Sequence, residues 1–311
     1  MNWERSCLFL VSIATLCLCA ERVPDFEVSN SELTSLVNQL RDEDFNKAGR
    51  KQVVVDYQGY ISTTSLGDNA KNKFFKYVDP QLLEKPTFQK LIALNDNFER
   101  ETGTSEEDTL QEKAEVDAFL DTIMSTKVWE TLYSFLHRKG HPYATSEKVF
   151  RQWILQLWFY KYSRYRGVPD SSGFEHVFIG EVKNNEVSGL HNWVRFYLLE
   201  QDGSEMLDYK GYLIKRYVYF TNVMAALKYS WKKEIKRTGS FLIGTSPEFD
   251  MALYTLCFLS RRGRHTCQVE VDGCPLQITS HDLIQRGKVY IGSVFPAAGR
   301  MTELCRINGR R

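Results

Sequence analysis

Apolar residues recur at helical spacing through the first half of the chain. The first such run covers residues 30–40, where leucine and valine lie three or four positions apart and Ser31 is a suitable N-cap. The same spacing predicts further helices over 80–95, 105–136 and 146–165. The last of these is rich in aromatic residues, which fit a protein core better than a ligand site. The pattern therefore predicts a helical N-terminal half.

The pattern changes after a loop over 167–173 that is rich in glycine, proline and serine. Beyond it apolar and polar residues alternate, which is typical of strands, and one helix interrupts them with Ser246 as N-cap and Pro247 at its first position. We predict strands over 174–182, 193–200, 209–220, 225–231, 240–244, 269–271, 276–279 and 288–295. Helices followed by strands indicate an α+β fold, with a helical lobe over 21–166 and a mainly antiparallel β-rich lobe over 167–311.

Residues 1–20 have the composition of a secretory signal peptide. Arg5 precedes an uncharged, mostly apolar run over 7–20 that is short for a membrane span. We expect a cleaved signal, with an N-terminal anchor as the alternative. A secreted protein without stable membrane association after cleavage is the resulting expectation.

Cysteine usage agrees with export. Three of the seven cysteines lie within 1–20, and four remain: Cys257, Cys267, Cys274 and Cys305. An even number fits two disulfides, for which three pairings are possible. Cys267 and Cys274 flank a turn at Asp272, so this pair could close across a hairpin. A zinc site is less favoured, because no C-x₂-C spacing is present.

Composition and charge exclude few classes of protein or binding partner. The chain has 311 residues, 43% hydrophobic and 25% charged, which is ordinary for a globular protein with a sizeable core. The net charge of +1 hides an acidic stretch over 101–125 and a basic stretch over 209–240, each with eight residues of its sign. These stretches indicate either two solvated faces or a groove that binds a polyanion.

Two of the six histidines, His176 and His191, lie fifteen positions apart in a window that also contains glycines and glutamates. Histidine exchanges protons near neutral pH, so the pair suggests an acid and a base. A structural role for each is the ordinary alternative. Two competing chemistries lack their motifs: the chain has no H-E-x-x-H for metal-dependent hydrolysis and no G-x-S-x-G for serine acyl transfer.

Five segments at and beyond these histidines are distinctive: SGFEHVFIGE (172–181), GLHNW (189–193), WKKEIK (231–236), GSFLIGTSPEF (239–249) and YIGSVFP (290–296). They carry a similarity to the EndoU family of uridylate-specific endoribonucleases. It runs in family order from about Ser29 to Pro296 and includes the helical half, for example at 85–88 and 105–107. The resemblance implies cleavage of single-stranded RNA at uridines, leaving a 2′,3′-cyclic phosphate.

The resemblance also implies roles for individual residues. His191 would be the general base, His176 the general acid, and Lys236 the cation that faces the phosphoryl oxygens. These roles are chemically reasonable, because RNA supplies its own nucleophile, the 2′-OH, and needs only proton transfer and charge stabilisation. Glu175 and Glu181 would support the site by orienting a histidine, by raising its pKa or by helping to hold a divalent ion.

Three further residues match the base-contacting positions of the family. Ser240 and Ser293 would offer hydroxyls to uracil, and Phe295 a stacking face. The family more often has Thr and Tyr at the last two positions, so the strictness of the uridine preference stays open. A divalent ion, Mn²⁺ or Ca²⁺, is implied by the resemblance alone. The expected partner is single-stranded RNA, and the protein is expected to be a monomer.

Two other functions are compatible with the sequence. One is a secreted RNA-binding or cell-surface interaction protein that keeps the fold without turnover. The other is a metal-dependent hydrolase of a different substrate. Cyclic-phosphate product ends would distinguish the expected enzyme from both.

Overall fold

The computed structural model describes residues 22–106, 108–218, 221–262, 266–303 and 305, so the predicted signal peptide lies outside the described residues. Within them the chain is α+β, as the sequence predicts. The helices are α1 (Asn30–Asp42), α2 (Pro80–Leu83), α3 (Pro86–Ala93), α4 (Leu110–Met124), α5 (Lys127–Arg138), α6 (Glu147–Phe159), α7 (Trp193–Gln201) and α8 (Pro247–Ser260), with short turns at Pro142–Ala144 and Glu175–Ile179. None of the helices in these ranges combines the length and apolar character that a bilayer span requires.

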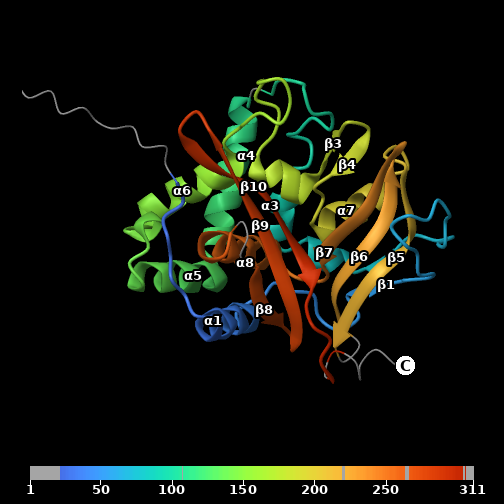
Figure 1. Cartoon of the computed structure of the whole chain (residues 1–311), viewed down its shortest axis with the longest axis horizontal. Coiled ribbons are helices and arrows are strands. Elements are labelled where there is room, and N and C mark those ends of the chain that lie inside the picture. The colour runs from blue at the N-terminus through green and yellow to red at the C-terminus, as the bar shows by residue number, and fades with distance from the viewer. Residues whose placement is uncertain (1–21, 107, 219–220, 263–265, 304, 306–311) are drawn as a thin grey trace, which may run out of the picture.

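The strands form three sheets. Their bounds are β1 (Val53–Val55), β2 (Phe75–Val78), β3 (Glu181–Lys183), β4 (Glu186–Ser188), β5 (Leu207–Val218), β6 (Thr221–Trp231), β7 (Glu234–Leu242), β8 (Cys267–Val271), β9 (Cys274–Gln285) and β10 (Lys288–Ala298). The orders are β1-β2, β10-β9-β8 and β3-β4-β7-β6-β5, and every pairing is antiparallel except β4 with β7. Figure 1 shows β8–β10 crossing the middle of the molecule, with α4–α6 on one side and β5–β7 on the other.

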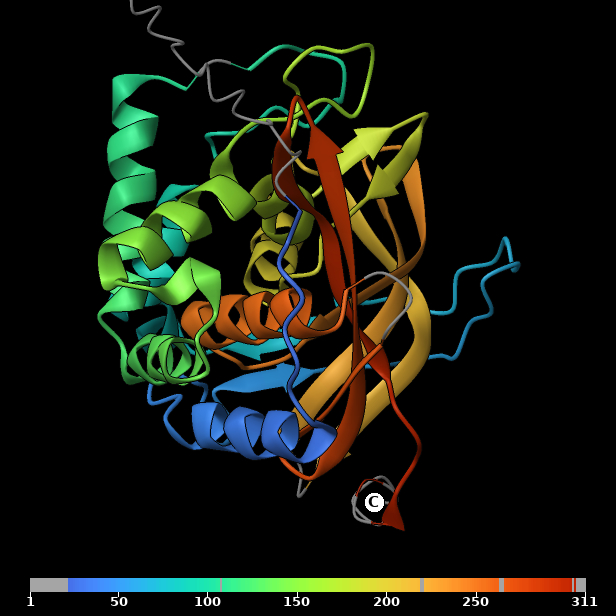
Figure 2. The same ribbon diagram turned by 60° about the vertical axis from the view of Figure 1, so that its left-hand side comes forward.

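Helix α8 holds the two halves of the chain together. All but its last residue are buried, which is the pattern of a helix surrounded by protein on all sides. It contacts α1, α3, α4 and α5 from the N-terminal half as well as β9 and β10. Figure 2 shows it running between the N-terminal helices and the β9–β10 hairpin. Ser246 accepts a hydrogen bond from the Phe249 amide and Pro247 takes the first helical position, as predicted.

The predicted helices are present, but their ends are set by local signals that periodicity does not reveal. The N-cap of α1 is Ser29 and not Ser31, because Ser29 and Glu32 form a reciprocal capping box. The run over 80–95 breaks into α2 and α3, since the residue before Pro86 is held extended. The run over 105–136 breaks at Thr126, whose backbone is also extended. The last helix ends at Phe159, short of the predicted residue 165.

Two of the predicted strands are wrong. Residues 193–200 form helix α7, because the Asn192 side chain caps it by accepting from the Arg195 amide at 3.0 Å. Residues 175–179 form a π-helical turn, and only residues 181 and 182 of the predicted strand 174–182 belong to a strand, β3. The turn is buried throughout, so the contrast between polar and apolar positions that distinguishes a turn from a strand is missing. The remaining predicted strands are found with shifted ends.

The four cysteines form two disulfides, Cys257–Cys267 and Cys274–Cys305. The suggested Cys267–Cys274 pair is therefore wrong. In the β8–β9 hairpin Cys274 lies opposite Val271, and Cys267 lies opposite Ile278 at the far end. The hairpin thus separates the two cysteines, and each is bonded to a different element.

Candidate functional site

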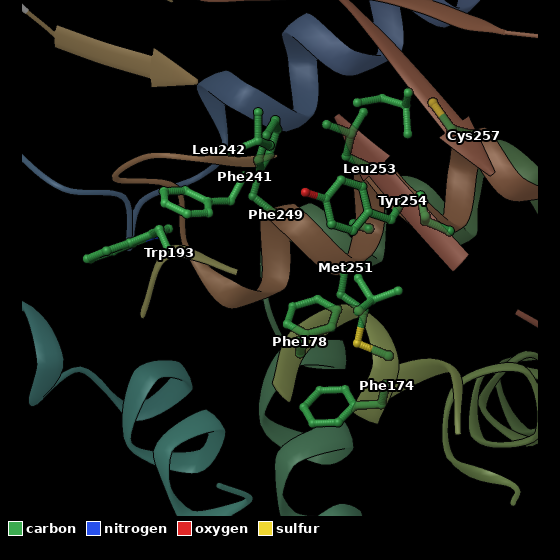
Figure 3. Packing of buried hydrophobic residues seen from close by; sticks show 14 of the residues in the cluster. Phe174, Phe178, Trp193, Phe241, Leu242, Phe249, Met251, Leu253, Tyr254 and Cys257 are labelled. Carbon is green, nitrogen blue, oxygen red and sulfur yellow. The ribbon is translucent and has the colours of Figure 1, made fainter. Parts of the chain in front are cut away.

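His176 lies on the buried π-helical turn Glu175–Ile179. The Gly180 amide donates to the Glu175 carbonyl at 2.8 Å, which closes the wide turn, and π-helical turns of this kind are frequent at functional sites. Phe174 and Phe178 stack with their ring centroids 4.9 Å apart. Figure 3 shows these rings beside Met251 of α8. The turn is therefore anchored in the core, and the position of His176 follows from that packing.

The segment that carries His191 is attached to this turn through the main chain. The Leu190 amide donates to the His176 carbonyl at 2.9 Å, and the His191 amide donates to the Val177 carbonyl at 2.7 Å. Gly189 permits the contact: its φ is +69°, and an added Cβ would lie 1.8 Å from the His176 carbonyl oxygen. These bonds bring the two imidazole rings to a centroid distance of 6.4 Å.

The His176 imidazole contacts a carboxylate on one side and a hydroxyl on the other. Its Nδ1 lies 2.7 Å from Glu181 Oε1, so this nitrogen carries a hydrogen and donates a hydrogen bond to the carboxylate. Its Nε2 lies 3.1 Å from Ser293 Oγ. Burial and the Arg164 charge lower the pKa of His176 to about 4, against the opposing effect of Glu181. The ligand-free site therefore holds this ring neutral.

The His191 ring has a defined tautomer. Its Nδ1 lies 2.8 Å from the Ser240 carbonyl oxygen, which can only accept, so Nδ1 carries the proton and Nε2 is left with a lone pair. Burial lowers the pKa of His191 well below its ordinary value, and the charges of Lys236 and His176 add to the effect. A neutral imidazole with a free Nε2 lone pair is the state that a general base requires.

Lys236 lies on β7, half-buried, and its charge lowers the pKa of both histidines. Burial lowers its own pKa to about 8, although Glu181 and Glu186 act in the opposite direction. It therefore stays cationic at neutral pH and can offer its charge to an anion at the site. The neighbouring Lys232 and Lys233 are exposed, and Lys232 forms an ion pair with Glu205 at 3.8 Å.

The three predicted base-contacting residues also gather at the histidines. Ser240 supplies the carbonyl that holds His191, and the Ser293 hydroxyl contacts His176. Phe295 stacks on His191, with a centroid distance of 5.3 Å and an angle of 28°. One face of this ring is therefore covered, and only the opposite face is left for a planar base.

Glu175 is placed differently from Glu181. Its side chain is fully buried, and neither carboxylate oxygen has a hydrogen-bond partner among the described residues. Its ion pair is with Lys161 at 3.8 Å, and Glu106 also pairs with this lysine. Burial and the nearby Glu106 charge raise the pKa of Glu175 well above its ordinary value. The structure thus joins Glu181 to His176 and directs Glu175 to Lys161.

The divalent ion implied by the resemblance does not fit the residues that the structure places. Across the described ranges no group of three or more His, Cys, Asp or Glu side chains is arranged to hold a metal. The densest group of carboxylates near the turn, Glu106, Asp108 and Glu175, surrounds the Lys161 ammonium. A lysine in this position already neutralises the ligands that a cation would need. We therefore assign no chemical step to a metal.

Sequence reasoning missed Arg164, which joins the parts of the site. Its Nε forms an ion pair with Glu181 Oε1 at 2.8 Å and donates a hydrogen bond to Ser171 Oγ at 3.0 Å, while Nη2 donates to Tyr162 Oη at 2.6 Å and to the Gly292 carbonyl. Ser171 Oγ in turn donates to the second oxygen of Glu181 at 2.8 Å. Since the bond to Gly292 spans 128 positions, no local pattern could reveal it.

Replacing Arg164 by methionine should raise the pKa of His176, because the Glu181 charge would then act on the imidazole without a competing cation. It should also lower the free energy of unfolding by about 3 kcal/mol, the usual cost of removing one partner of a buried pair. An NMR titration of His176 and urea unfolding measure the two effects. Arg164→Lys is the control, since it keeps the charge and loses the planar fork. An unchanged or lowered His176 pKa in the methionine variant would contradict this assignment.

The basic segment over 209–240 does not act as one charged strip. Lys210 pairs with Asp68 at 3.0 Å, and Arg237 pairs with Glu186 at 3.5 Å. Lys228 is buried and donates to the backbone carbonyls of Thr63 and Ser65. Much of this charge is thus used within the protein, and Lys236 is the cation that the segment brings to the histidines.

Together these features define a class of site. An α+β framework brings two neutral histidines, each of which donates its Nδ1–H to a fixed acceptor, next to a lysine and the Ser293 hydroxyl. Such a site has the groups for general acid–base chemistry on an anionic substrate.

Comparison with known proteins places the chain within this class. A sequence model described as "Endoribonuclease XendoU" matches residues 32–296, and the chain belongs to this family. It is 40% identical over 282 residues to a poly(U)-specific endoribonuclease-B of Xenopus laevis, covering 86% of this chain and 94% of the relative. A bovine (Bos taurus) uridylate-specific endoribonuclease is 38% identical over 276 residues, covering 86% of this chain and 65% of the relative, so the chain spans about two thirds of that protein.

A solved structure supports the same placement. The structure titled "The structure of XendoU: a splicing independent snoRNA processing endoribonuclease" matches with a TM-score of 0.74 at 36% identity. The match covers 89% of this chain and 100% of that one. The α+β fold predicted from the sequence is therefore confirmed by both the arrangement of the described elements and this similarity.

Proposed function

We propose that the chain is a secreted uridylate-specific endoribonuclease that cleaves single-stranded RNA by attack of the ribose 2′-OH. The observation that carries the proposal is the state of the two histidines. His176 donates its Nδ1–H to Glu181, and His191 donates its Nδ1–H to the Ser240 carbonyl. The Nε2 atom of each ring is then available for proton transfer beside Lys236. The names of the relatives, uridylate-specific and poly(U)-specific endoribonucleases, give the substrate class.

In the proposed step His191 Nε2 takes the proton of the uridine 2′-OH. The 2′-oxygen forms a bond to the adjacent phosphorus while the bond from phosphorus to the 5′-oxygen of the next nucleotide breaks. His176 Nε2, protonated as the imidazolium, gives its proton to that leaving oxygen. The products are a 2′,3′-cyclic phosphate and a 5′-hydroxyl. The carboxylate of Glu181 stabilises the imidazolium form of His176, which suits this residue to the acid role.

Lys236 and the polar groups around it complete the proposal. The ammonium would face the phosphoryl oxygens, where negative charge accumulates in the transition state. The hydroxyls of Ser240 and Ser293 are available to the carbonyl and N–H groups of uracil. When RNA binds, the Ser293 hydroxyl would have to exchange its contact with His176 for one to the substrate.

The proposal is tested by cleavage of four RNA homopolymers, each with and without manganese. We expect poly(U) to be cleaved in preference to the others, with products that carry cyclic-phosphate ends. Products without cyclic ends would point to a hydrolase, and binding without products to a protein that keeps only the fold. Either result would overturn the proposal, and the manganese series would report whether an added ion changes the rate.

The pH dependence follows from the lowered pKa values of the two histidines. The reactive form needs His176 protonated and His191 neutral, and in the free protein burial and Arg164 hold the pKa of His176 at about 4. Raising the pH therefore deprotonates the acid, and kcat/KM should be bell-shaped with its maximum below about pH 6. A bound phosphodiester stabilises the imidazolium, so the maximum of kcat should lie at higher pH. A kcat/KM that rises steadily from about pH 5 to 8 would contradict this assignment.

Secretion and the monomeric state are also part of the proposal. All four cysteines outside residues 1–20 are paired in disulfides, which suits an oxidising compartment. Detection of the protein in the medium of expressing cells, and its mass in solution by light scattering, test the two statements.

A further inference from the structure

Two histidines lie beside Phe295, and one of them has no part in the proposed chemistry. The ring stacks on His191, and it also lies near His281 of β9. The second pair is looser and more tilted, with a centroid distance of 6.3 Å against 5.3 Å and an interplanar angle of 35° against 28°. His281 is therefore an aromatic neighbour of Phe295 outside the acid–base pair.

The position of His281 follows from the register of the β9–β10 hairpin. A bulge between Ile291 and Ser293 shifts the pairing so that Ser293 lies directly opposite His281. Side chains at opposite positions of an antiparallel pair point to the same face, and bulges commonly redirect side chains next to functional sites. The hairpin thus directs His281 to the face that carries Ser293 and Phe295.

Phe295 and His281 differ in rigidity. Strand β10 is fixed here, because Arg164 binds the Gly292 carbonyl and Ser293 binds His176. His281 is exposed, and among the described residues its imidazole has no hydrogen bond or ion pair. Exposed side chains change rotamer within nanoseconds, so this ring can turn away from Phe295 and return. The Phe295 ring is therefore held in place, whereas the His281 ring can move.

We propose that His281 and Phe295 form a clamp that holds the uracil of the cleaved uridine between their rings, a proposal that rests on the proposed function. Phenyl and imidazole rings both stack on nucleobases, and a planar base can stack on Phe295 when His281 turns away from that ring. The base is then held within reach of the Ser293 hydroxyl, on the strand that contacts His176. His281 is accordingly a specificity residue that contacts the substrate and takes no part in proton transfer.

The test uses RNA analogues with one cleavable ribonucleotide in a 2′-deoxy background, either uridine or 5,6-dihydrouridine. Dihydrouracil keeps the carbonyl and N–H groups of uracil and loses the flat ring, so it removes stacking alone. We expect His281→Ala to lower kcat/KM on uridine about tenfold, mainly through KM, as for the loss of one stacked base. The same variant should have little effect on dihydrouridine, and His281→Phe should behave like the native protein on both. His137→Ala, which removes an exposed histidine on α5, is the control.

Two results would overturn the clamp. One is an equal loss on uridine and dihydrouridine, or no loss at all. The other is a loss that disappears when the neighbouring nucleotides are abasic, which would place the neighbouring base, and not uracil, on His281. Affinity for uncleavable 2′-deoxyuridine and its dihydro analogue is measured in parallel. A protein that binds without turnover would refute the proposed function and still report on the clamp.

Discussion

His191→Ala should reduce kcat on a uridine-containing oligonucleotide by about 10²–10⁴-fold, the usual contribution of a positioned general base. The alanine variant has no acceptor for the 2′-OH proton, whereas the native Nε2 lone pair is kept free by the bond from Nδ1 to the Ser240 carbonyl. His176→Ala should produce a loss of similar size, because the leaving oxygen would depart without a proton. The double variant should be little worse than either single one, since the two residues act as a unit.

Steady-state cleavage of a fluorogenic oligonucleotide measures these losses, and thermal unfolding shows whether each variant still folds. His137→Ala is the matched control, because this histidine is exposed on α5 and bonds to the Ala144 carbonyl. It should keep the native rate. If the His191 variant folds and cleaves as fast as the native protein, the assignment of the base is refuted.

Gly189→Ala should lower kcat about 100-fold without removing any reacting group. An alanine Cβ would lie 1.8 Å from the His176 carbonyl oxygen, so the two segments would have to move apart and the distance between the two imidazoles would increase. Displacements of about 1 Å at a reacting centre can cost about this factor. The free energy of unfolding should fall as well, because the amide bonds of Leu190 and His191 to the turn would be stretched.

Gly140→Ala is the control for backbone strain. Its φ of +71° is close to the +69° of Gly189, but nothing lies within 4 Å of an added Cβ. It should cost about 1–2 kcal/mol for the left-handed conformation and leave cleavage unchanged. If both variants lose activity alike, or if neither does, the clash at His176 is not what sets the geometry of the site.

The sequence predicted the fold class because helical spacing and alternation are strong over most of the chain. It failed where those patterns are weakest. At 175–179 every residue is buried, so no polar, solvent-exposed positions reveal whether the segment has helical or strand periodicity. At 193–200 the alternation suggested a strand, but the Asn192 cap and the core contacts of Trp193 favour a helix. Both errors lie at the histidines, where packing against distant elements overrides local preference.

For the candidate site, sequence reasoning proposed residues and missed how they are supported. His176, His191, Lys236 and Glu181 lie together in the structure, each was marked separately by the resemblance, and their catalytic roles stay predictions. Arg164 joins groups more than a hundred positions apart, and no spacing within one segment contains that information. The disulfide pairing was undetermined for the same reason, because it depends on which elements become neighbours in space.

The attachment of the His191 segment to the π-helical turn has a consequence for sequence divergence. The two hydrogen bonds that set the spacing of the histidines join peptide groups, at Leu190 with His176 and at His191 with Val177. A peptide carbonyl is present whatever side chain a position carries, and a peptide N–H is absent only from proline, so no mutation at Val177 and only proline at Leu190 deletes these bonds directly. Selection on the spacing then acts on Gly189 and on the core packing that holds the turn, and less on the side chains of Leu190 and Val177. A protein built this way can lose most of its sequence identity and retain the same distance between its two imidazoles.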